Sequence, residues 1–234
     1  MSDARDEELQ SGLGRVRARI RTACAAVDRP PEDVTLVVVT KTFPASDVRR
    51  LAALGVRDIG ENRHQEARGK VRECADLDLS WHFIGRLQSN KAAAVAGYAT
   101  AVHSVDRLSL VGPLSKGAHG AGRTVQCLVQ VSLDDPAASD RGGAAPGQLD
   151  ELSAAIEDAD ALTLRGLMAV APLDADPEDA FARLARIMRE FRAEHPRATW
   201  LSAGMSGDLE TAVKFGATHV RVGSAVLGLR PPLR

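Results

Sequence analysis

The chain has 234 residues, with 30 basic and 31 acidic side chains and a net charge of −1. This balance, together with an aromatic fraction of only 3%, argues against a nucleic-acid-binding protein and against a protein held to anionic membranes. No apolar stretch reaches the roughly 20 residues that a membrane helix needs.

Residues 1–10 are polar and acidic, unlike a secretory signal, so we expect a cytoplasmic protein. Cys24, Cys74 and Cys127 show no pairing motif and are expected to be small buried hydrophobic residues. The six histidines are not spaced as metal ligands, and we expect no metal site.

The first predicted element is a helix over residues 7–27. Its apolar residues recur at helical spacing, at Leu9, Leu13, Val16, Ile20, Ala23 and Val27. Two prolines, Pro30 and Pro31, mark its end.

Eight short runs rich in β-branched residues then alternate with helical patterns. The predicted strands are 35–40, 57–60, 81–84, 100–104, 124–131, 162–170, 199–202 and 218–222. The predicted helices between and after them are 45–54, 62–74, 89–96, 106–116, 146–158, 177–194 and 207–215.

This alternation predicts a parallel sheet, because each parallel crossover needs a connection about as long as a helix. Eight strands favour an α/β fold of the (β/α)8 TIM-barrel type with an extra N-terminal helix, and an open doubly wound sheet is the alternative. We expect residues 1–234 to form one domain, with the barrel at about 34–230. The long loop 132–147 follows the fifth strand and is either a flap over a ligand or a surface insertion.

Ligand sites in such barrels lie at the C-terminal ends of the strands. Lys41 directly follows the first predicted strand. Burial against an apolar strand end lowers the pKa of a lysine, and a neutral amine attacks an aldehyde to form a Schiff base. A lysine that extends to the surface at the barrel rim is the alternative.

The seventh and eighth predicted strands end in turns with small residues, within the stretches 201–208 and 220–224. Barrels commonly bind phosphate at these two positions, where small side chains let the backbone approach the anion. Ser206 and Ser224 add hydroxyl donors. Two ordinary turns are the alternative interpretation.

Seven stretches, in order along the chain, make the sequence recognisable. They are Val39-Thr40-Lys41-Thr42, Gly60-Glu61-Asn62, Trp81-His82-Phe83-Ile84-Gly85, Leu87-Gln88-Ser89-Asn90-Lys91, Arg165-Gly166-Leu167-Met168, Gly204-Met205-Ser206 and Arg221-Val222-Gly223-Ser224-Ala225. As a set they resemble the pyridoxal phosphate homeostasis family, also called YggS or PROSC, whose fold is the barrel of the alanine racemase N-terminal domain.

The resemblance implies that pyridoxal 5′-phosphate (PLP) is held as a Schiff base on Lys41. It places Ser206, Gly223 and Ser224 around the phosphate with Ser202 nearby, and Arg221 opposite the pyridine nitrogen. It also implies that the pocket is lined by Asn62, His82 and Met168.

The sequence departs from the family pattern at three places. Position 203 is alanine where methionine is usual, and Phe43 replaces a second lysine two residues after Lys41. A lysine common in the fifth-strand loop has no equivalent near residues 140–142. Any transfer of PLP that depends on those lysines is therefore in doubt here.

PLP enzymes draw charge into a protonated ring nitrogen that is usually paired with a carboxylate. Arginine is always charged, so Arg221 opposite this nitrogen would keep it unprotonated. The sequence ends at Arg234, which leaves no room for the β-domain that completes the site of alanine racemase.

We therefore expect a PLP carrier or buffer in intracellular PLP homeostasis, without catalytic residues. We expect it to be a monomer, with PLP-dependent apo-enzymes as potential partners. The alternatives are a PLP-dependent racemase-like enzyme and a barrel that binds another phosphorylated metabolite non-covalently.

Overall fold

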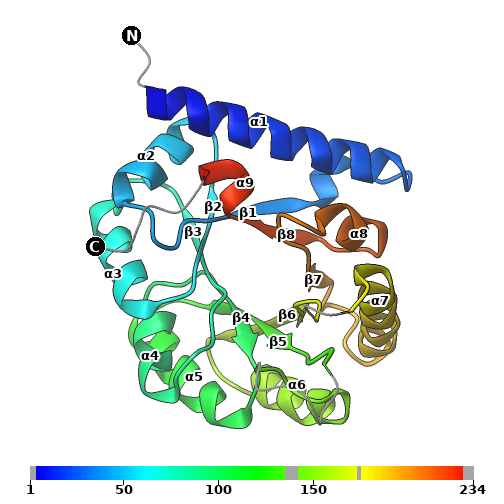
Figure 1. The fold of residues 1–234 in the computed structure, drawn as a ribbon. Coiled ribbons are helices and arrows are strands. Elements are labelled where there is room, and N and C mark those ends of the chain that lie inside the picture. The colour runs from blue at the N-terminus through cyan, green and yellow to red at the C-terminus, as the bar shows by residue number, and fades with distance from the viewer. Residues whose placement is uncertain (1–3, 135–141, 173–174, 229–234) are drawn as a thin grey trace.

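Eight parallel strands form a closed barrel in chain order, with β8 hydrogen-bonded back to β1 (Figure 1). The computed structural model describes residues 4–134, 142–172 and 175–228. The strands are β1 (Thr35–Val39), β2 (Asp58–Glu61), β3 (Ser80–Phe83), β4 (Ala101–Val105), β5 (Val125–Gln130), β6 (Leu162–Met168), β7 (Trp200–Ser202) and β8 (His219–Val222). The predicted (β/α)8 barrel is confirmed, and the open sheet is excluded by the β1–β8 pairing.

Helices surround the strands (Figure 1). They are α1 (Ala4–Ala25), α2 (Ala45–Ala53), α3 (His64–Glu73), α4 (Ser89–Ala96), α5 (Val111–Gly120), α6 (Leu149–Glu157), α7 (Pro177–Glu194), α8 (Leu209–Lys214) and α9 (Ser224–Leu227). Short 3₁₀ turns occur at Pro31–Asp33, Leu108–Leu110 and Pro146–Gln148.

The predicted helix over 106–116 is wrong at its start. Arg107 is extended, with φ −162° and ψ 152°, and α5 begins only at Val111 after a 3₁₀ turn. The side chain of Arg107 explains the difference, because it donates to Asp106 at 2.6 Å and to the Leu87 carbonyl at 2.7 Å. The short helix α9 was not predicted.

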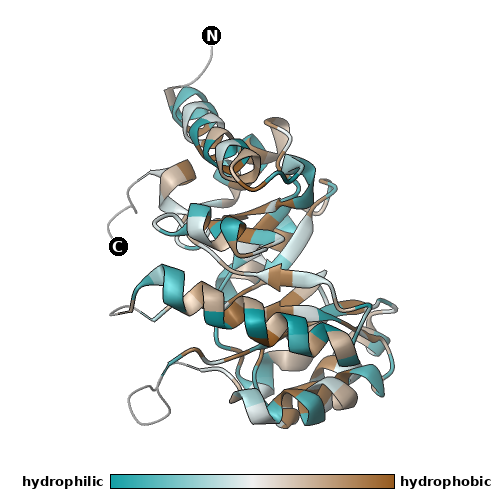
Figure 2. Cartoon of the chain, turned by 90° about the vertical axis from the view of Figure 1, so that its right-hand side faces the viewer, coloured by the Kyte–Doolittle hydropathy of each residue, from teal (hydrophilic) through white to brown (hydrophobic). Residues whose placement is uncertain are grey.

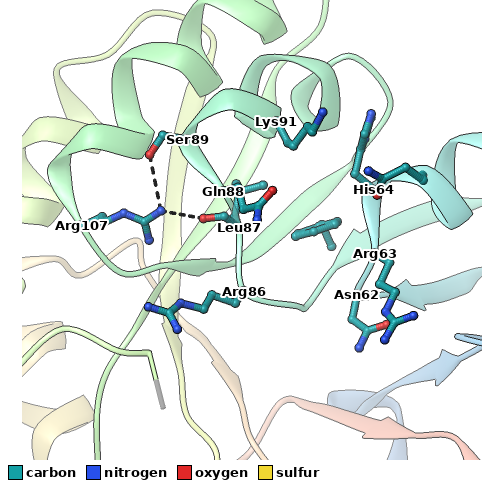
Figure 3. Close-up of a pocket in the computed structure, with 11 residues that line it drawn as sticks. Asn62, Arg63, His64, Arg86, Leu87, Gln88, Ser89, Lys91 and Arg107 are labelled. Carbon is teal, nitrogen blue, oxygen red and sulfur yellow. Dashed lines mark hydrogen bonds between the residues drawn. The ribbon is translucent and has the colours of Figure 1, made fainter. Parts of the chain in front are cut away.

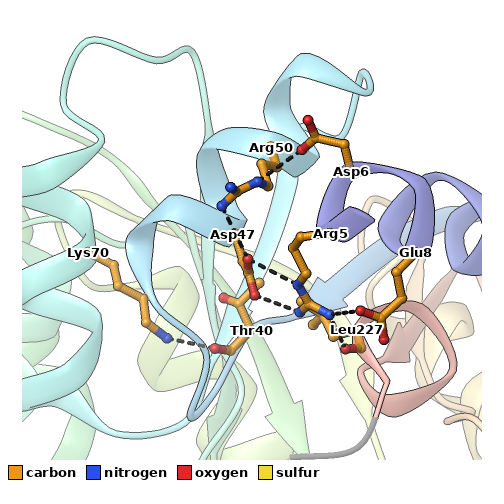
Figure 4. A network of polar contacts seen from close by, with 8 residues as sticks. All are labelled: Arg5, Asp6, Glu8, Thr40, Asp47, Arg50, Lys70 and Leu227. Atoms are coloured by element: carbon orange, nitrogen blue, oxygen red, sulfur yellow. Dashed lines mark hydrogen bonds and ion pairs between the residues drawn. The ribbon is translucent and has the colours of Figure 1, made fainter. Parts of the chain in front are cut away.

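The helix α1 packs across the outside of the barrel, next to α8 and α9 (Figure 1). Its apolar face buries Leu9, Leu13 and Val16. At its start, Arg5 donates to the buried carboxylate of Asp47 in α2 at 2.6 Å and to the Leu227 carbonyl at 3.0 Å (Figure 4). These hydrogen bonds join α1 to α2 and to α9.

Most of the apolar core lies between the strands and the helices, in two clusters. One surrounds α4 to α7, and the other joins α1, α2 and α8 to β1, β2 and β8. Hydrophilic and hydrophobic residues lie side by side along each helix, as amphipathic helices require (Figure 2). The three cysteines are free and buried, which confirms their predicted role in the core.

The loop after β5 is described only at its two ends. There Ser132 donates its backbone N–H to the Ala144 carbonyl at 2.9 Å. Residues 135–141 lie outside the described residues, so the choice between a flap and an insertion stays open. Within the described ranges, no helix has the length and apolar character needed to cross a bilayer.

Candidate functional site

A cavity of about 270 Å³ opens at the C-terminal ends of β1 and β8. It is lined by Val39, Lys41, Phe43, Ile84, Met205, Ser206, Gly207, Arg221, Gly223 and Ser224. Lys41 follows β1, whereas the other polar lining residues come from β8 and from the turns after β7 and β8. The structure therefore brings Lys41 together with four of its predicted neighbours, namely Ser206, Arg221, Gly223 and Ser224.

The two small-residue turns meet at this cavity. The hydroxyl oxygens of Ser206 and Ser224 lie 3.5 Å apart. Gly204, which starts the first turn, has φ +90°, and a Cβ placed there would lie 2.6 Å from the Ala212 Cβ. A side chain on Gly223 would lie 3.1 Å from the Val39 carbonyl oxygen. Only glycine suits the backbone of the first turn, and the second can approach β1 closely because it carries no side chain there.

The residues on either side of Lys41 are held by a buried charged network. Lys70 in α3 donates 2.6 Å hydrogen bonds to the Thr40 carbonyl (Figure 4) and to the Glu61 carboxylate. The Thr40 hydroxyl donates to the same carboxylate at 2.6 Å. On the other side, the backbone N–H of Thr42 donates to Glu66. Thr42 has φ +70°, a left-handed conformation that is rare for a β-branched residue.

This network was not predicted from the sequence. Burial raises the pKa of Glu61, whereas the charge and hydrogen bonds of Lys70 oppose that rise. Two signals were present: Glu61 lies in the recognisable stretch Gly60-Glu61-Asn62, and Lys70 follows Glu66 by four residues, which places both on one helix face.

Arg221 points into the barrel from β8 and is almost fully buried. Its guanidinium donates to the Ser202 hydroxyl at 2.6 Å and to the Ala169 carbonyl at 2.9 Å. Burial lowers the pKa of Arg221 to about 10, so it is still a cation at neutral pH. Two protein acceptors thus fix a charged group in the wall of the cavity.

A chain of hydrogen bonds continues from Ser202 through the barrel interior. The Ser202 hydroxyl lies 2.9 Å from His103 Nδ1, and His103 Nε2 lies 2.9 Å from His82 Nδ1. His82 Nε2 in turn lies 3.0 Å from the Asp58 carboxylate, at the N-terminal end of β2. Burial lowers the pKa of His103 well below its usual range, so this imidazole is neutral.

A His82 tautomer with its proton on Nε2 donates to the Asp58 carboxylate and accepts at Nδ1. His103 must then donate from Nε2 and accept at Nδ1, which makes the Ser202 hydroxyl the donor. The lone pairs of Ser202 remain available for Arg221. In this arrangement each hydrogen bond of the chain, from the Arg221 guanidinium to Asp58 at the opposite rim of the barrel, has one donor and one acceptor.

Four predicted pocket residues do not line the cavity in the described part of the chain. His82 and Ser202 lie in the interior relay below it, because their positions on β3 and β7 direct them to the barrel axis. Met168 is buried at the end of β6. Asn62 instead lines a second, larger cavity beyond β2. Of the described residues, no group of His, Cys, Asp or Glu is arranged to hold a metal ion.

Comparison with known proteins identifies the family of the chain. The family model described as "Alanine racemase, N-terminal domain" matches residues 12–231. The pyridoxal phosphate homeostasis protein of Mycobacterium tuberculosis is 42% identical over 97% of this chain and 94% of that protein. The chain belongs to the pyridoxal phosphate homeostasis family.

Other members of the family match along nearly their whole length. The homeostasis protein of Escherichia coli is 35% identical over 95% of this chain and 97% of that protein. The structure of PipY from Synechococcus elongatus with PLP bound has a TM-score of 0.80 and 35% identity, and the match covers 94% of this chain and all of that one.

Proposed function

We propose that this chain binds PLP as a Schiff base on Lys41 and acts in intracellular PLP homeostasis by holding and releasing the cofactor. The observation that carries the proposal is the meeting of Lys41 with Ser206, Gly223 and Ser224 around one cavity. The lysine and the two turns lie at opposite ends of the barrel sequence. They become neighbours only because β1 pairs with β8.

The cavity suits PLP in size and in chemistry. Its volume of about 270 Å³ is just below the roughly 300–1,000 Å³ of sites for drug-sized molecules. The Lys41 amine can condense with an aldehyde with loss of water, and two hydroxyls and a glycine backbone can bind a phosphate. The PLP-bound PipY structure and the homeostasis relatives support the same ligand.

We propose further that the bound cofactor is not turned over. PLP supplies an electron sink for carbanion chemistry when its ring nitrogen is protonated. The polar group that this chain offers in the cavity wall, next to the lysine and the two serines, is Arg221. A guanidinium that is a cation at neutral pH and is engaged by Ser202 and Ala169 cannot accept or share a ring proton as a carboxylate does.

The covalent site is tested by the visible absorption band of the imine. We expect PLP-treated protein to show this band, and borohydride reduction to fix the cofactor on Lys41 in a peptide mass spectrum. Lys41→Ala should abolish both signals, whereas Lys116→Ala, at an exposed position on α5, should change neither. An adduct on a different lysine would overturn the assignment of Lys41.

The same preparation distinguishes the two alternatives. Phosphate-dependent binding without any imine band would indicate a non-covalent binder of phosphorylated metabolites. Racemisation of alanine at rates typical of an enzyme, about 1–10³ s⁻¹, would contradict the proposal of a carrier.

We propose a monomer in a reducing, cytoplasmic compartment, with PLP-dependent apo-enzymes as recipients. This one chain supplies both the lysine and the two small-residue turns of the proposed site. Free, buried cysteines suit a reducing compartment. Light scattering of the purified protein tests the monomer, and reactivation of an apo-enzyme by the loaded protein, faster than by released PLP, tests delivery.

A further inference from the structure

A second cavity, of about 690 Å³, lies at the C-terminal ends of β2 and β3. It shares no lining residue with the cavity around Lys41. Figure 3 shows its wall, built from the loop before α3, the loop before α4 and the first turns of both helices. The proposed function uses none of these residues.

The wall of this cavity is strongly basic. Arg63, Arg86, Lys91 and Arg107 all line it, and no acidic residue does. Arg107 is fixed by Asp106 and by the Leu87 carbonyl. The structure gives Arg63, Arg86 and Lys91 no ion-pair partner within the ranges it describes. The chain as a whole has a net charge of −1, so this is a local concentration of positive charge.

Uncapped helix ends add to the positive potential. The helices α3 and α4 both begin at the cavity, at His64 and Ser89, and neither has a side-chain cap. Their first backbone N–H groups therefore lack intrahelical acceptors and direct the positive ends of two helix dipoles toward the cavity.

Two buried polar atoms in the wall lack partners. Nδ1 of His64 and Oδ1 of Asn62 are inaccessible to water and make no hydrogen bond in the described structure. Buried polar atoms are normally paired, so the unpaired Nδ1 of His64 indicates a missing ligand or water. The Asn62 oxygen is an acceptor and would pair with a donor such as water, not with an anion. The pKa of His64 is lowered, first by burial and then by the charges of Lys91 and Arg68. An anion is the ligand that would relieve this repulsion.

We propose that this cavity binds the phosphate group of a phosphomonoester, non-covalently and independently of Lys41. Arginine forks match the geometry of a phosphate, and three cations without partners suit a dianion better than a single carboxylate. The volume exceeds that needed for the phosphate alone, so the ligand is a phosphorylated small molecule such as a sugar phosphate or a nucleotide. Arg86 and Lys91 are the residues expected to hold the charge.

The test is calorimetric titration of PLP-loaded protein, in which the Lys41 cavity is filled. The probes are inorganic phosphate, glucose 6-phosphate and AMP, with acetate as the monoanionic control. We expect phosphate and at least one ester to bind and acetate not to. The ester that binds more tightly identifies the sugar phosphate or the nucleotide as the natural class.

Variants locate the site. Arg86→Ser combined with Lys91→Ala should weaken phosphate binding about tenfold or more, whereas Arg189→Ala, at an exposed position on α7, should not change it. A Ser206→Ala, Ser224→Ala double variant should also leave it unchanged. Loss of binding in the serine variant but not in the Arg86 variant would overturn the proposal, and so would an absence of phosphate binding.

A second readout does not depend on PLP. In NMR titrations, phosphate should raise the pKa of His64, because a nearby dianion favours the imidazolium form. The His64→Gln variant identifies the resonance. A failure of PLP to attach to Lys41 would contradict the proposed function alone. A rise of the His64 pKa with phosphate that is lost in the variant with Arg86→Ser and Lys91→Ala would then still support phosphate binding in this cavity. An unchanged His64 pKa at saturating phosphate contradicts it.

Discussion

The hydroxyl of Ser202 accepts a 2.6 Å hydrogen bond from the guanidinium of Arg221, deep inside the barrel. On its other side the same hydroxyl meets His103 at 2.9 Å. One small side chain thus connects the charged wall of the cofactor cavity to the histidine relay that ends at Asp58.

The first prediction concerns this connection. Ser202→Ala leaves both Arg221 and His103 with an unpaired nitrogen in a buried site. We expect the free energy of unfolding to fall by about 2–3 kcal/mol, measured by urea denaturation. The imine band of loaded protein should persist with weaker PLP affinity. Ser206→Ala, at a half-buried hydroxyl, is the matched control and should change stability by less than about 0.5 kcal/mol.

The second prediction is a pH dependence of stability. Burial lowers the pKa of His219 to about 3 and that of His103 well below its usual range. Both are neutral in the folded protein, whereas the unfolded chain binds protons below about pH 6.5. Stability should therefore be greatest above about pH 7 and fall as the pH drops, by up to about 1.4 kcal/mol per pH unit for each histidine.

Denaturation at a series of pH values measures this slope. Glu61, whose pKa is raised, acts in the opposite direction and reduces the slope at the acidic end. The slope of the unfolding free energy against pH measures how many more protons the unfolded chain binds than the folded one. His219→Phe should lower this number by about one, whereas His119→Gln, at an exposed position, should leave the slope unchanged. Stability that is constant between pH 7 and 5 would contradict neutral, buried His103 and His219.

The third prediction concerns the turn after β7. Gly204→Ala adds a Cβ at φ +90° and 2.6 Å from Ala212. The turn must shift, and we expect a loss of about 1–3 kcal/mol in stability together with weaker PLP binding by equilibrium dialysis. Gly207→Ala is the control three residues away, since a Cβ there meets nothing within 4 Å. Equal effects of both substitutions would argue against a specific role for Gly204.

The fourth prediction concerns the support beneath Lys41. Lys70→Met removes the cation that holds the Thr40 carbonyl and leaves Glu61 buried without a charge partner. We expect about 3–5 kcal/mol of destabilisation, measured by thermal and urea unfolding, and slower imine formation. Adding Glu61→Gln to Lys70→Met should restore part of the stability, because the uncompensated charge is then gone. No recovery in the double variant would contradict the ion pair as the cause.

The barrel was predictable because its signal repeats. Each strand lies in a short run with β-branched or aromatic residues, and each is followed by a helical pattern or turn, so every strand lies within two residues of its predicted limits. The meeting of Lys41, Ser206 and Ser224 at one cavity was also predictable, since the carboxyl ends of parallel strands meet at one rim whatever their distance in sequence. Their contact with a cofactor stays a prediction.

The interior of the barrel was not predictable in the same way. A strand buried on both faces does not reveal which residues face the axis and which face the helices. His82 and Ser202 were therefore expected at the cofactor, although they lie in the relay below it. The Lys70–Glu61 pair depends on how α3 lies against β2, and no spacing in the sequence encodes that angle.

The bond from Arg5 to the Leu227 carbonyl has a consequence for biosynthesis. The helix α1 is synthesised before α8 and α9, yet much of its docking surface is α8 and α9, with Gly12 so close to Val226 that a Cβ there would lie 2.3 Å from the carbonyl oxygen. During translation α2 is available early to the start of α1, but the rest of the apolar face of α1 lacks these two native partners until almost the whole chain has emerged. We expect nascent chains truncated before β8 to engage chaperones through α1, because their exposed apolar stripe is the one that the finished protein covers last.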